Sequence, residues 1–165
     1  MVLNKLGARA TFESGSNLQP DTNIEASLNA MLTTGQFSAK ERPDLVPVLT
    51  AYALAENRPC RVVEAANLKK KESDRIEDLA RLLKAGGGRV ETTDNSLVVT
   101  PQDQPDTVRV NTASDHRLAF AAAVLAARRE SVEVDLPWVV RKSYPEFWHD
   151  LRRSGWIARP KMAEK

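Results

Sequence analysis

The sequence predicts an α/β protein that is built from repeated units of helices and short strands. Three observations support this fold class. Four helices can be placed from their start signals and from the spacing of their apolar residues. Short stretches rich in β-branched residues lie between these helices. Finally, a constant offset of 71 residues, the separation of Asp44 and Asp115, brings the first and third helices into register.

The composition is that of one soluble domain, and it excludes several functional classes. The 165 residues carry a formal net charge of only +2, which does not indicate a nucleic-acid-binding surface. No apolar run is long enough to cross a membrane, and the first residues lack the pattern of a signal peptide. The single cysteine, Cys60, has no partner for an intramolecular disulfide, and the two histidines lie far apart. We therefore expect a reduced, cytoplasmic protein without a metal site.

The first two helices are indicated by their apolar stripes. The first begins near Asp44 and carries Pro47 in its first turn, where a missing N–H has no consequence. The second begins near Ser73 and ends at the glycines of residues 86–88. Residues of the two stripes recur at helical spacing: Leu45, Val48, Leu49 and Tyr52 in the first helix, and Ile76, Leu79, Ala80 and Leu83 in the second.

The third and fourth helices have different signatures. The third begins near Asp115 and runs to Arg128; it is apolar on nearly all sides (LAFAAAVLAA), which predicts deep burial. The fourth opens with Ser143-Tyr144-Pro145-Glu146, which predicts a capping box with a proline in the first turn.

Short strands are predicted around and between these helices. We expect them at residues 61–63, 90–92, 97–100, 108–111 and 132–135, and further strands near 8–12, 23–27 and 36–39. The chain, residues 1–165, then divides into the tail of an earlier unit (1–40), one unit at 41–112 and a second unit at 113–165.

Charged residues gather at the predicted helix starts, which the repeat places along one edge of the structure. They are Asp44; Lys71, Glu72 and Arg75; Asp115, His116 and Arg117; and Lys142. Helix starts present free N–H groups and favour anions, while arginine and lysine suit carboxylate and phosphate groups. Arg117 lies in the first turn of a buried helix, where a cation requires an anionic partner. These residues predict a site for a ligand that carries phosphate and carboxylate groups.

Each of these groups also has a simpler structural interpretation. The run KKKE at residues 69–72 is typical of a solvated helix face. Asp44 and Asp115 can each act as an N-cap, which contributes about 1 kcal/mol. His116 can be structural, and Lys142 can be an ordinary surface residue. The anion-site hypothesis is favoured only because the repeat places all of these groups at equivalent positions.

Four motifs carry a family resemblance: DLVP at residues 44–47, KESDRI at 71–76, DHRLAF at 115–120 and KSYPEFW at 142–148. In order and spacing they resemble the carboxy-terminal lobe of the 5-enolpyruvylshikimate-3-phosphate synthase (3-phosphoshikimate 1-carboxyvinyltransferase) family. The resemblance implies an incomplete inside-out α/β barrel of βαβαββ units. It also implies transfer of the enolpyruvyl group of phosphoenolpyruvate to the 5-hydroxyl of shikimate 3-phosphate, with release of phosphate, in chorismate and aromatic amino acid biosynthesis. No metal or organic cofactor is implied.

The resemblance implies a role for each matched residue. Arg75 and Arg117 match the arginines that hold the carboxylate of phosphoenolpyruvate, and Asn67 and Lys71 match groups that contact shikimate 3-phosphate. Three residues match catalytic groups: Asp44, the base for the 5-hydroxyl; Glu72, which moves a proton at the C3 methylene; and Lys142, the proton donor to the leaving phosphate.

The resemblance does not extend to the family's amino-terminal lobe or to the first unit of its carboxy-terminal lobe. Because the family's active site lies between the lobes, we expect this chain to be inactive alone. Three hypotheses follow: a piece of a transferase that requires a complementary amino-terminal lobe, a non-catalytic module that binds phosphoenolpyruvate or another anion, or a structural remnant of a truncated gene.

Overall fold

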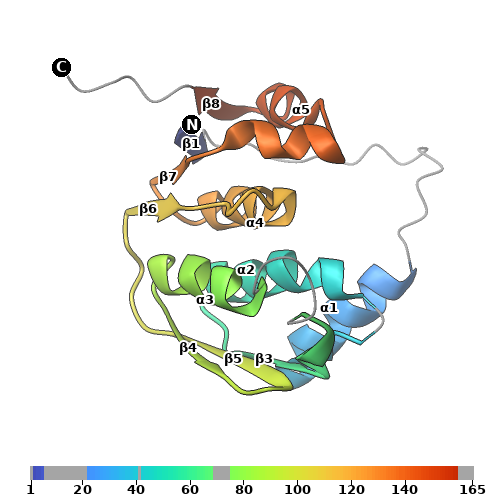
Figure 1. Cartoon of the computed structure of the whole chain (residues 1–165). Coiled ribbons are helices and arrows are strands. Elements are labelled where there is room, and N and C mark those ends of the chain that lie inside the picture. Colours follow the sequence, from blue (N-terminus) through green and yellow to red (C-terminus); the bar gives the residue numbers. More distant parts are fainter. Residues whose placement is uncertain (1, 6–21, 41, 69–74, 160–165) are drawn as a thin grey trace.

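A computed structural model describes residues 2–5, 22–40, 42–68 and 75–159 of the chain (Figure 1). The strands form two four-stranded sheets, and the two most completely buried helices lie between them. In the view of Figure 1 one sheet, called the first sheet below, lies at the bottom; α2 (Val46–Ala55) and α3 (Arg75–Ala85) lie above it, and α4 (His116–Ala126) follows.

The first sheet has the strand order β2-β3-β5-β4, and the second has the order β6-β7-β1-β8. In the first sheet β2 and β3 are parallel and the other pairs are antiparallel; in the second, β6 and β7 are parallel and the other pairs are antiparallel. The first sheet comprises β2 (Gln36–Ser38), β3 (Cys60–Val63), β4 (Gly88–Thr92) and β5 (Ser96–Pro101). The second comprises β1 (Val2–Lys5), β6 (Thr107–Val110), β7 (Ser131–Val134) and β8 (Trp156–Arg159).

Five α-helices and three short 3₁₀ helices occur in the described part of the chain. The α-helices are α1 (Thr22–Thr34), α2 (Val46–Ala55), α3 (Arg75–Ala85), α4 (His116–Ala126) and α5 (Phe147–Arg153). The 3₁₀ helices are η1 (Pro43–Leu45), η2 (Ala65–Leu68) and η3 (Pro137–Lys142). None of these helices is both long and apolar enough to cross a lipid bilayer.

The core is centred on α2 and α4, which pack directly on each other. Small side chains allow the two backbones to approach closely, as at Ala51 and Ala122, which are fully buried. Leu54 and Leu125 are also buried, and both pack against the α3 terminus: a Cβ added at Gly86 would lie 3.0 Å from Leu54 Cδ2 and 3.2 Å from Leu125 Cδ1. The core therefore joins the two repeated helices to the end of the helix between them.

Most of the predicted elements after residue 35 are confirmed. The strands predicted at 61–63, 90–92, 97–100, 108–111 and 132–135 correspond to β3, β4, β5, β6 and β7, and that at 36–39 corresponds to β2. The stripe of α3 is buried as expected, although Ser73, its predicted start, lies outside the described residues. The strand predicted near 8–12 also lies outside them.

The strand predicted near residues 23–27 is wrong, because this segment belongs to α1. The apolar residues that follow, Leu28, Met31 and Leu32, have helical spacing, and Met31 is buried in the core. Gly35 follows the last residue of α1. Its φ of 69° is a conformation that favours glycine, and its N–H donates to the Met31 carbonyl at 2.9 Å. The helical periodicity therefore decides the conformation of the whole segment.

The predicted capping box at Ser143 is also wrong. Ser143 is instead the C-cap residue of η3, and its N–H donates to the Val140 carbonyl at 3.1 Å. Helix α5 begins only at Phe147, and Glu146 precedes it without a side-chain capping bond. Because the chain is still completing η3 at Ser143, helical geometry is reached only after Pro145.

Burial of α4 is less uniform than its sequence predicts. Seven of its residues are buried, but Phe120 and Val124 are only partly covered. They line an apolar groove of about 520 Å³ together with residues of α2 and α5, including Tyr52 and Phe147. Helix α4 thus has one flank that the described residues do not cover.

Candidate functional site

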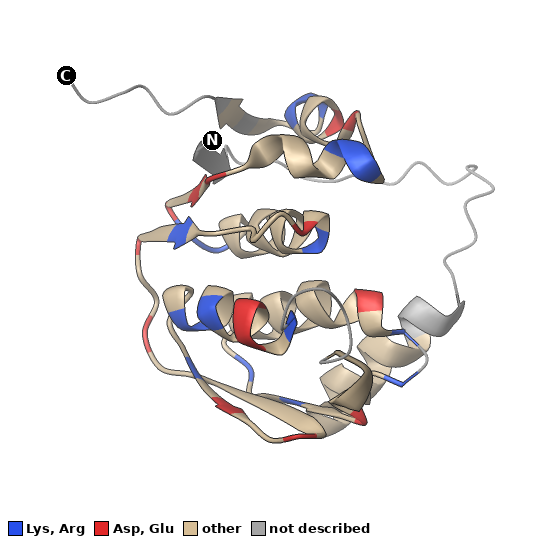
Figure 2. Cartoon of the chain, viewed as in Figure 1, with Lys and Arg blue, Asp and Glu red and all other residues tan. Residues whose placement is uncertain are grey.

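Four charged side chains from three separate elements meet at one edge of the molecule. Asp44 lies in η1 just before α2, Arg75 is the first residue of α3, and Asp115 and Arg117 lie at the start of α4. Figure 2 shows charged positions at the right-hand ends of α2 and α4, where these helices begin. The expectation that helix starts share one edge is met for these three helices.

The four side chains alternate in charge at close range. Arg117 Nε lies 2.7 Å from Asp44 Oδ1, and Arg117 Nη1 lies 3.2 Å from Asp115 Oδ1. Arg75 Nη1 lies 4.0 Å from Asp44 Oδ1, and Arg75 Nε lies 3.8 Å from Asp115 Oδ2. Each arginine is therefore shared between the same two carboxylates, and we call these four residues the Asp–Arg cluster.

The members of the Asp–Arg cluster differ sharply in exposure. The side chains of Arg75, Arg117 and Asp115 are 20%, 19% and 16% exposed, whereas that of Asp44 is 63% exposed. Apolar residues lie beneath the cluster: Val46, Pro47, Leu68, Leu79 and Leu118. These apolar neighbours exclude water on one side, which strengthens interactions of the two guanidinium groups with anions.

Asp115 has a second task besides its contacts with the arginines. Its Oδ1 accepts a hydrogen bond from the backbone N–H of Arg117 at 2.9 Å, which confirms the predicted N-cap of α4. The predicted N-cap role of Asp44 is wrong. Asp44 lies within η1, one residue too early to cap α2, and the N-cap residue is Leu45, whose side chain has no polar atom. The carboxylate of Asp44 contacts Arg117 instead.

His116 belongs to the same edge, although the sequence favoured a structural interpretation. Its Nδ1 lies 3.8 Å from Asp115 Oδ1, and its ring packs edge-on against Phe120. Burial lowers the pKa of His116 below its ordinary value of 6.5, and the positive charges of Arg117 and Lys142 lower it further against the opposing effect of Asp115. The surroundings of His116 therefore favour its neutral imidazole.

The other predicted site residues are placed as follows. Lys142 ends η3 with an exposed side chain. Asn67 is exposed in η2, which packs against η1 beside Asp44. Lys71 and Glu72 lie outside the described residues.

The bridging contacts of Asp115 were not predicted from the sequence. It was interpreted there as a cap, whereas the structure also places it between Arg75 and Arg117. The offset that equates it with Asp44 was the available signal, since both precede helices at the same edge.

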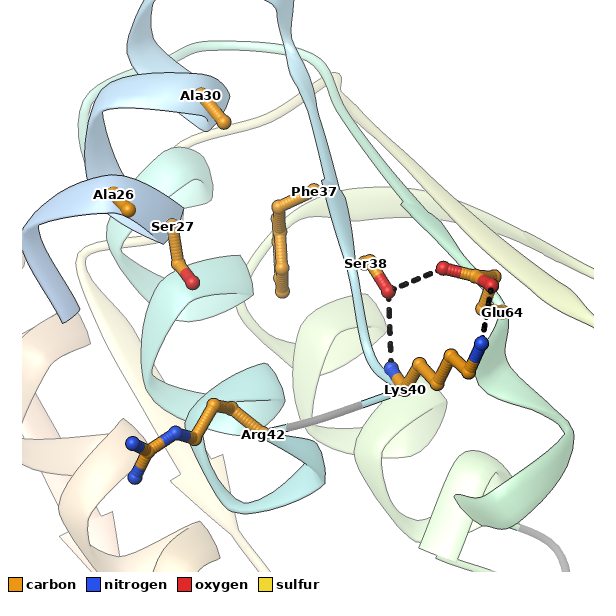
Figure 3. A pocket seen from close by; sticks show the side chains of 8 residues that line it. All are labelled: Ala26, Ser27, Ala30, Phe37, Ser38, Lys40, Arg42 and Glu64. Atoms are coloured by element: carbon orange, nitrogen blue, oxygen red, sulfur yellow. Dashed lines mark hydrogen bonds and ion pairs between the residues drawn. The ribbon is translucent and has the colours of Figure 1, made fainter. Parts of the chain in front are cut away.

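A second pocket of about 420 Å³ lies between α1 and the end of β2 (Figure 3). Phe37 lies at its side, and Glu64, with a φ of 55°, extends a carboxylate toward it. That carboxylate accepts a hydrogen bond from Ser38 Oγ at 2.6 Å and lies 4.0 Å from Lys40 Nζ. The charges of Glu64 and Lys40 are thus partnered with each other, so this pocket is a weaker candidate for anion binding than the Asp–Arg cluster.

Metal and thiol chemistry find no support in the described residues. Nowhere in residues 2–5, 22–40, 42–68 or 75–159 do three or more histidine, cysteine, aspartate or glutamate side chains form a group that could hold a metal ion. Cys60 is buried, and burial raises the pKa of its thiol to about 12. A protonated thiol is not a nucleophile at neutral pH.

The fold and the Asp–Arg cluster define a class: repeated α/β units that gather arginines and carboxylates at the starts of buried helices. Comparison with known proteins identifies the family. The family model for EPSP synthase (3-phosphoshikimate 1-carboxyvinyltransferase) matches residues 1–151, and the chain belongs to this family of transferases. The resemblance indicated by the four sequence motifs is confirmed.

Curated relatives named 3-phosphoshikimate 1-carboxyvinyltransferase match most of this chain but only part of their own length. The protein from Clostridium acetobutylicum is 36% identical over 120 residues, which are 72% of this chain and 28% of the relative. That from Methanoculleus marisnigri is 38% identical over 120 residues, covering 73% and 28%. That from Clostridium perfringens is 29% identical over 157 residues, covering 94% and 35%. The chain spans about a third of the length of these relatives.

A solved structure of EPSP synthase from Acinetobacter baumannii has a similar fold. It superposes with a TM-score of 0.59 at 23% identity, over 68% of this chain and 28% of that one. The predicted fold class, an incomplete α/β lobe of this family, is confirmed.

Proposed function

We propose that this chain forms the phosphoenolpyruvate-binding part of a 3-phosphoshikimate 1-carboxyvinyltransferase. The reaction transfers the enolpyruvyl group of phosphoenolpyruvate to the 5-hydroxyl of shikimate 3-phosphate and releases phosphate, in the cytoplasmic route to chorismate. One observation carries the proposal: in a chain of this family, Arg75 and Arg117 converge from the starts of two helices onto one cluster. Two guanidinium forks beside two helix N-termini provide the donors that a carboxylate requires.

The proposed chemistry assigns a task to each matched residue. Arg75 and Arg117 bind the carboxylate of phosphoenolpyruvate and fix its orientation. Protonation at C3 makes C2 electrophilic, and the 5-hydroxyl adds to C2 as its proton passes to Asp44. Glu72 carries the proton to and from C3.

The second half of the reaction expels phosphate. Collapse of the tetrahedral adduct breaks the bond between C2 and the phosphate oxygen, and C3 loses a proton to restore the double bond. Lys142 protonates the departing phosphate, while Asn67 and Lys71 hold shikimate 3-phosphate. The positive charges at this edge stabilise the anionic adduct.

We further propose that the remaining contacts come from a complementary amino-terminal lobe and that this chain is inactive without it. The relatives support this proposal, because the part that matches is only 28% of the length of each. Within the chain we retain the division into a tail (1–40) and two units (41–112 and 113–165), which the equivalence of α2 and α4 supports.

A second candidate function is binding without catalysis. The Asp–Arg cluster lies within this chain, while the chain matches only 28% to 35% of the curated relatives. A protein with this cluster alone would bind phosphoenolpyruvate or a similar anion and release it unchanged.

Phosphate release tests the proposal. The chain is incubated with phosphoenolpyruvate and shikimate 3-phosphate, first alone and then with a separately prepared fragment of the Clostridium acetobutylicum relative that contains its amino-terminal lobe and the first unit of its carboxy-terminal lobe. We expect turnover only in the mixture and none when Arg117→Ala replaces the natural chain. Binding of phosphoenolpyruvate without turnover in the mixture would favour the binding module, and absence of both would refute the proposal.

A further inference from the structure

Arg117 has two edges that can hold a carboxylate with two parallel hydrogen bonds, and each already has one nitrogen engaged. Asp44 Oδ1 forms an ion pair beside the edge of Nε and Nη2, at 2.7 Å from Nε. The edge of Nη1 and Nη2 is engaged by Asp115 at Nη1, at 3.2 Å. A ligand carboxylate that approaches either edge of Arg117 to form two hydrogen bonds therefore meets one of these two aspartates and competes with it for the guanidinium group.

The two aspartates differ in how firmly they are held. Asp115 is largely buried, accepts the capping hydrogen bond of α4 and contacts the two arginines with both of its carboxylate oxygens. Asp44 is 63% exposed, and both of its arginine contacts use the single oxygen Oδ1. Exposed ion pairs contribute little to stability, whereas breaking a buried, capped one leaves polar groups without partners. Asp44 is thus the carboxylate that exchanges at low cost.

We propose that Asp44 is an internal competitor that a ligand carboxylate displaces from Arg117, while Asp115 stays in place and orients both guanidinium groups. This inference rests on the proposed function. It adds a coupling between binding and chemistry: arrival of the phosphoenolpyruvate carboxylate at Arg117 releases Asp44 to accept the proton of a hydroxyl group. The same aspartate is restrained by Arg117 before binding and available as a base after it.

The alternative is that the pair of Asp44 and Arg117 only fastens η1 to α4. The two interpretations predict opposite signs for one measurement. If Asp44 competes, removal of its charge strengthens binding of a carboxylate ligand. If Asp44 only holds η1 against α4, removal of its charge leaves the arginines less well positioned and weakens binding of the ligand.

Isothermal titration calorimetry with phosphoenolpyruvate distinguishes them in the full chain. We expect Asp44→Asn to bind roughly two- to fivefold more tightly, the factor that corresponds to loss of one competing exposed ion pair. Asp115→Asn keeps a good capping residue but no longer orients the arginines. It is expected to bind more weakly while its melting temperature stays close to that of the natural chain.

Asp78→Asn is the matched control for a general change in charge. Asp78 lines the same apolar hollow beside Arg75, but its carboxylate pairs with Arg81 at 3.0 Å. Equal strengthening by Asp78→Asn and Asp44→Asn would overturn the competition, as would weaker binding by Asp44→Asn or stronger binding by Asp115→Asn.

Arg117→Ala separates this inference from the proposed function. Equal heats for the natural chain and Arg117→Ala would refute the proposed site, and the competition with it. Binding that depends on Arg117 but is not strengthened by Asp44→Asn would refute the competition alone.

Discussion

The two repeated units use the same position for different purposes. Asp44 and Asp115 lie at equivalent places before α2 and α4, yet Asp115 caps its helix and is only 16% exposed, while Asp44 is 63% exposed and contacts an arginine of the other unit. Ten residues further along, Leu54 and Leu125 are also equivalent, and both are fully buried. The repeat thus retains the same packing in the helix bodies, while the helix starts differ in the contacts that matter for ligands.

The equivalence does not extend to the strands that follow. Cys60 and Val62 are the buried residues of β3, whereas Val132 and Val134 are those of β7. The inward-facing positions are therefore shifted by one residue between the units, although the strands begin at the same offset. A shift of one residue turns the opposite face of a strand toward the core, so β3 and β7 bury non-equivalent side chains.

The largest expected effect tests whether the helix bodies are truly equivalent. Leu54→Ala and Leu125→Ala should each lower the free energy of unfolding by about 2–5 kcal/mol, because both leave a cavity in the packed core. Similar losses are expected since both leucines pack against the same residue, Gly86. Urea denaturation measures the two losses, and a difference of several kcal/mol between them would break the equivalence.

A smaller effect should separate the two helix starts. Asp115→Ala removes the N-cap of α4 and should lower the free energy of unfolding by about 1–2 kcal/mol. Asp44→Ala removes only an exposed ion pair and should change it by about 0.5 kcal/mol or less. The same denaturation experiment applies. Equal losses would mean that Asp44 supports the fold as much as Asp115 does.

The smallest effect concerns the residue after each aspartate, which is Leu45 in one unit and His116 in the other. Burial lowers the pKa of His116 in the folded protein, so the unfolded chain binds a proton more readily. The stability that His116 contributes is complete above pH 6.5 and decreases as the pH falls from 6.5 toward the folded pKa.

Thermal unfolding between pH 5 and pH 8 measures this pH dependence. His116→Leu, which copies Leu45 of the first unit, is the matched variant. Its stability should decline less than that of the natural chain as the pH falls below 6.5. Parallel curves for the two proteins would show that His116 is not the group responsible.

Local patterns predicted much of this fold from the sequence, and the errors have physical causes. The helices α2, α3 and α4 and six of the strands were predicted because each has a strong spacing of its own. The segment at 23–27 was predicted as a strand because the helical periodicity becomes clear only in the residues after it. The capping pattern at Ser143 was misleading because the preceding η3 continues to that residue.

The sequence predicted which residues form the site but not which of them contact each other. The repeat indicated that Asp44, Arg75 and Arg117 lie at one edge, and the structure brings them together. Their pairing is set by side-chain rotamers and by the insertion of η1 before α2, neither of which a sequence pattern specifies. The bridging contacts of Asp115 depend on the same three-dimensional detail.

The position of β1 has a consequence for the order in which the chain folds. Residues 36–101 contain every strand of the first sheet, so that sheet can assemble from one continuous segment. In the second sheet β1, from residues 2–5, lies between β7 and β8, and Leu3 pairs with both Val132 and Ala158. Contacts between such distant residues carry a large loop-closure entropy and form slowly. During synthesis on a ribosome, the first sheet can therefore form early, while β1 must wait for nearly the whole chain before its partners exist.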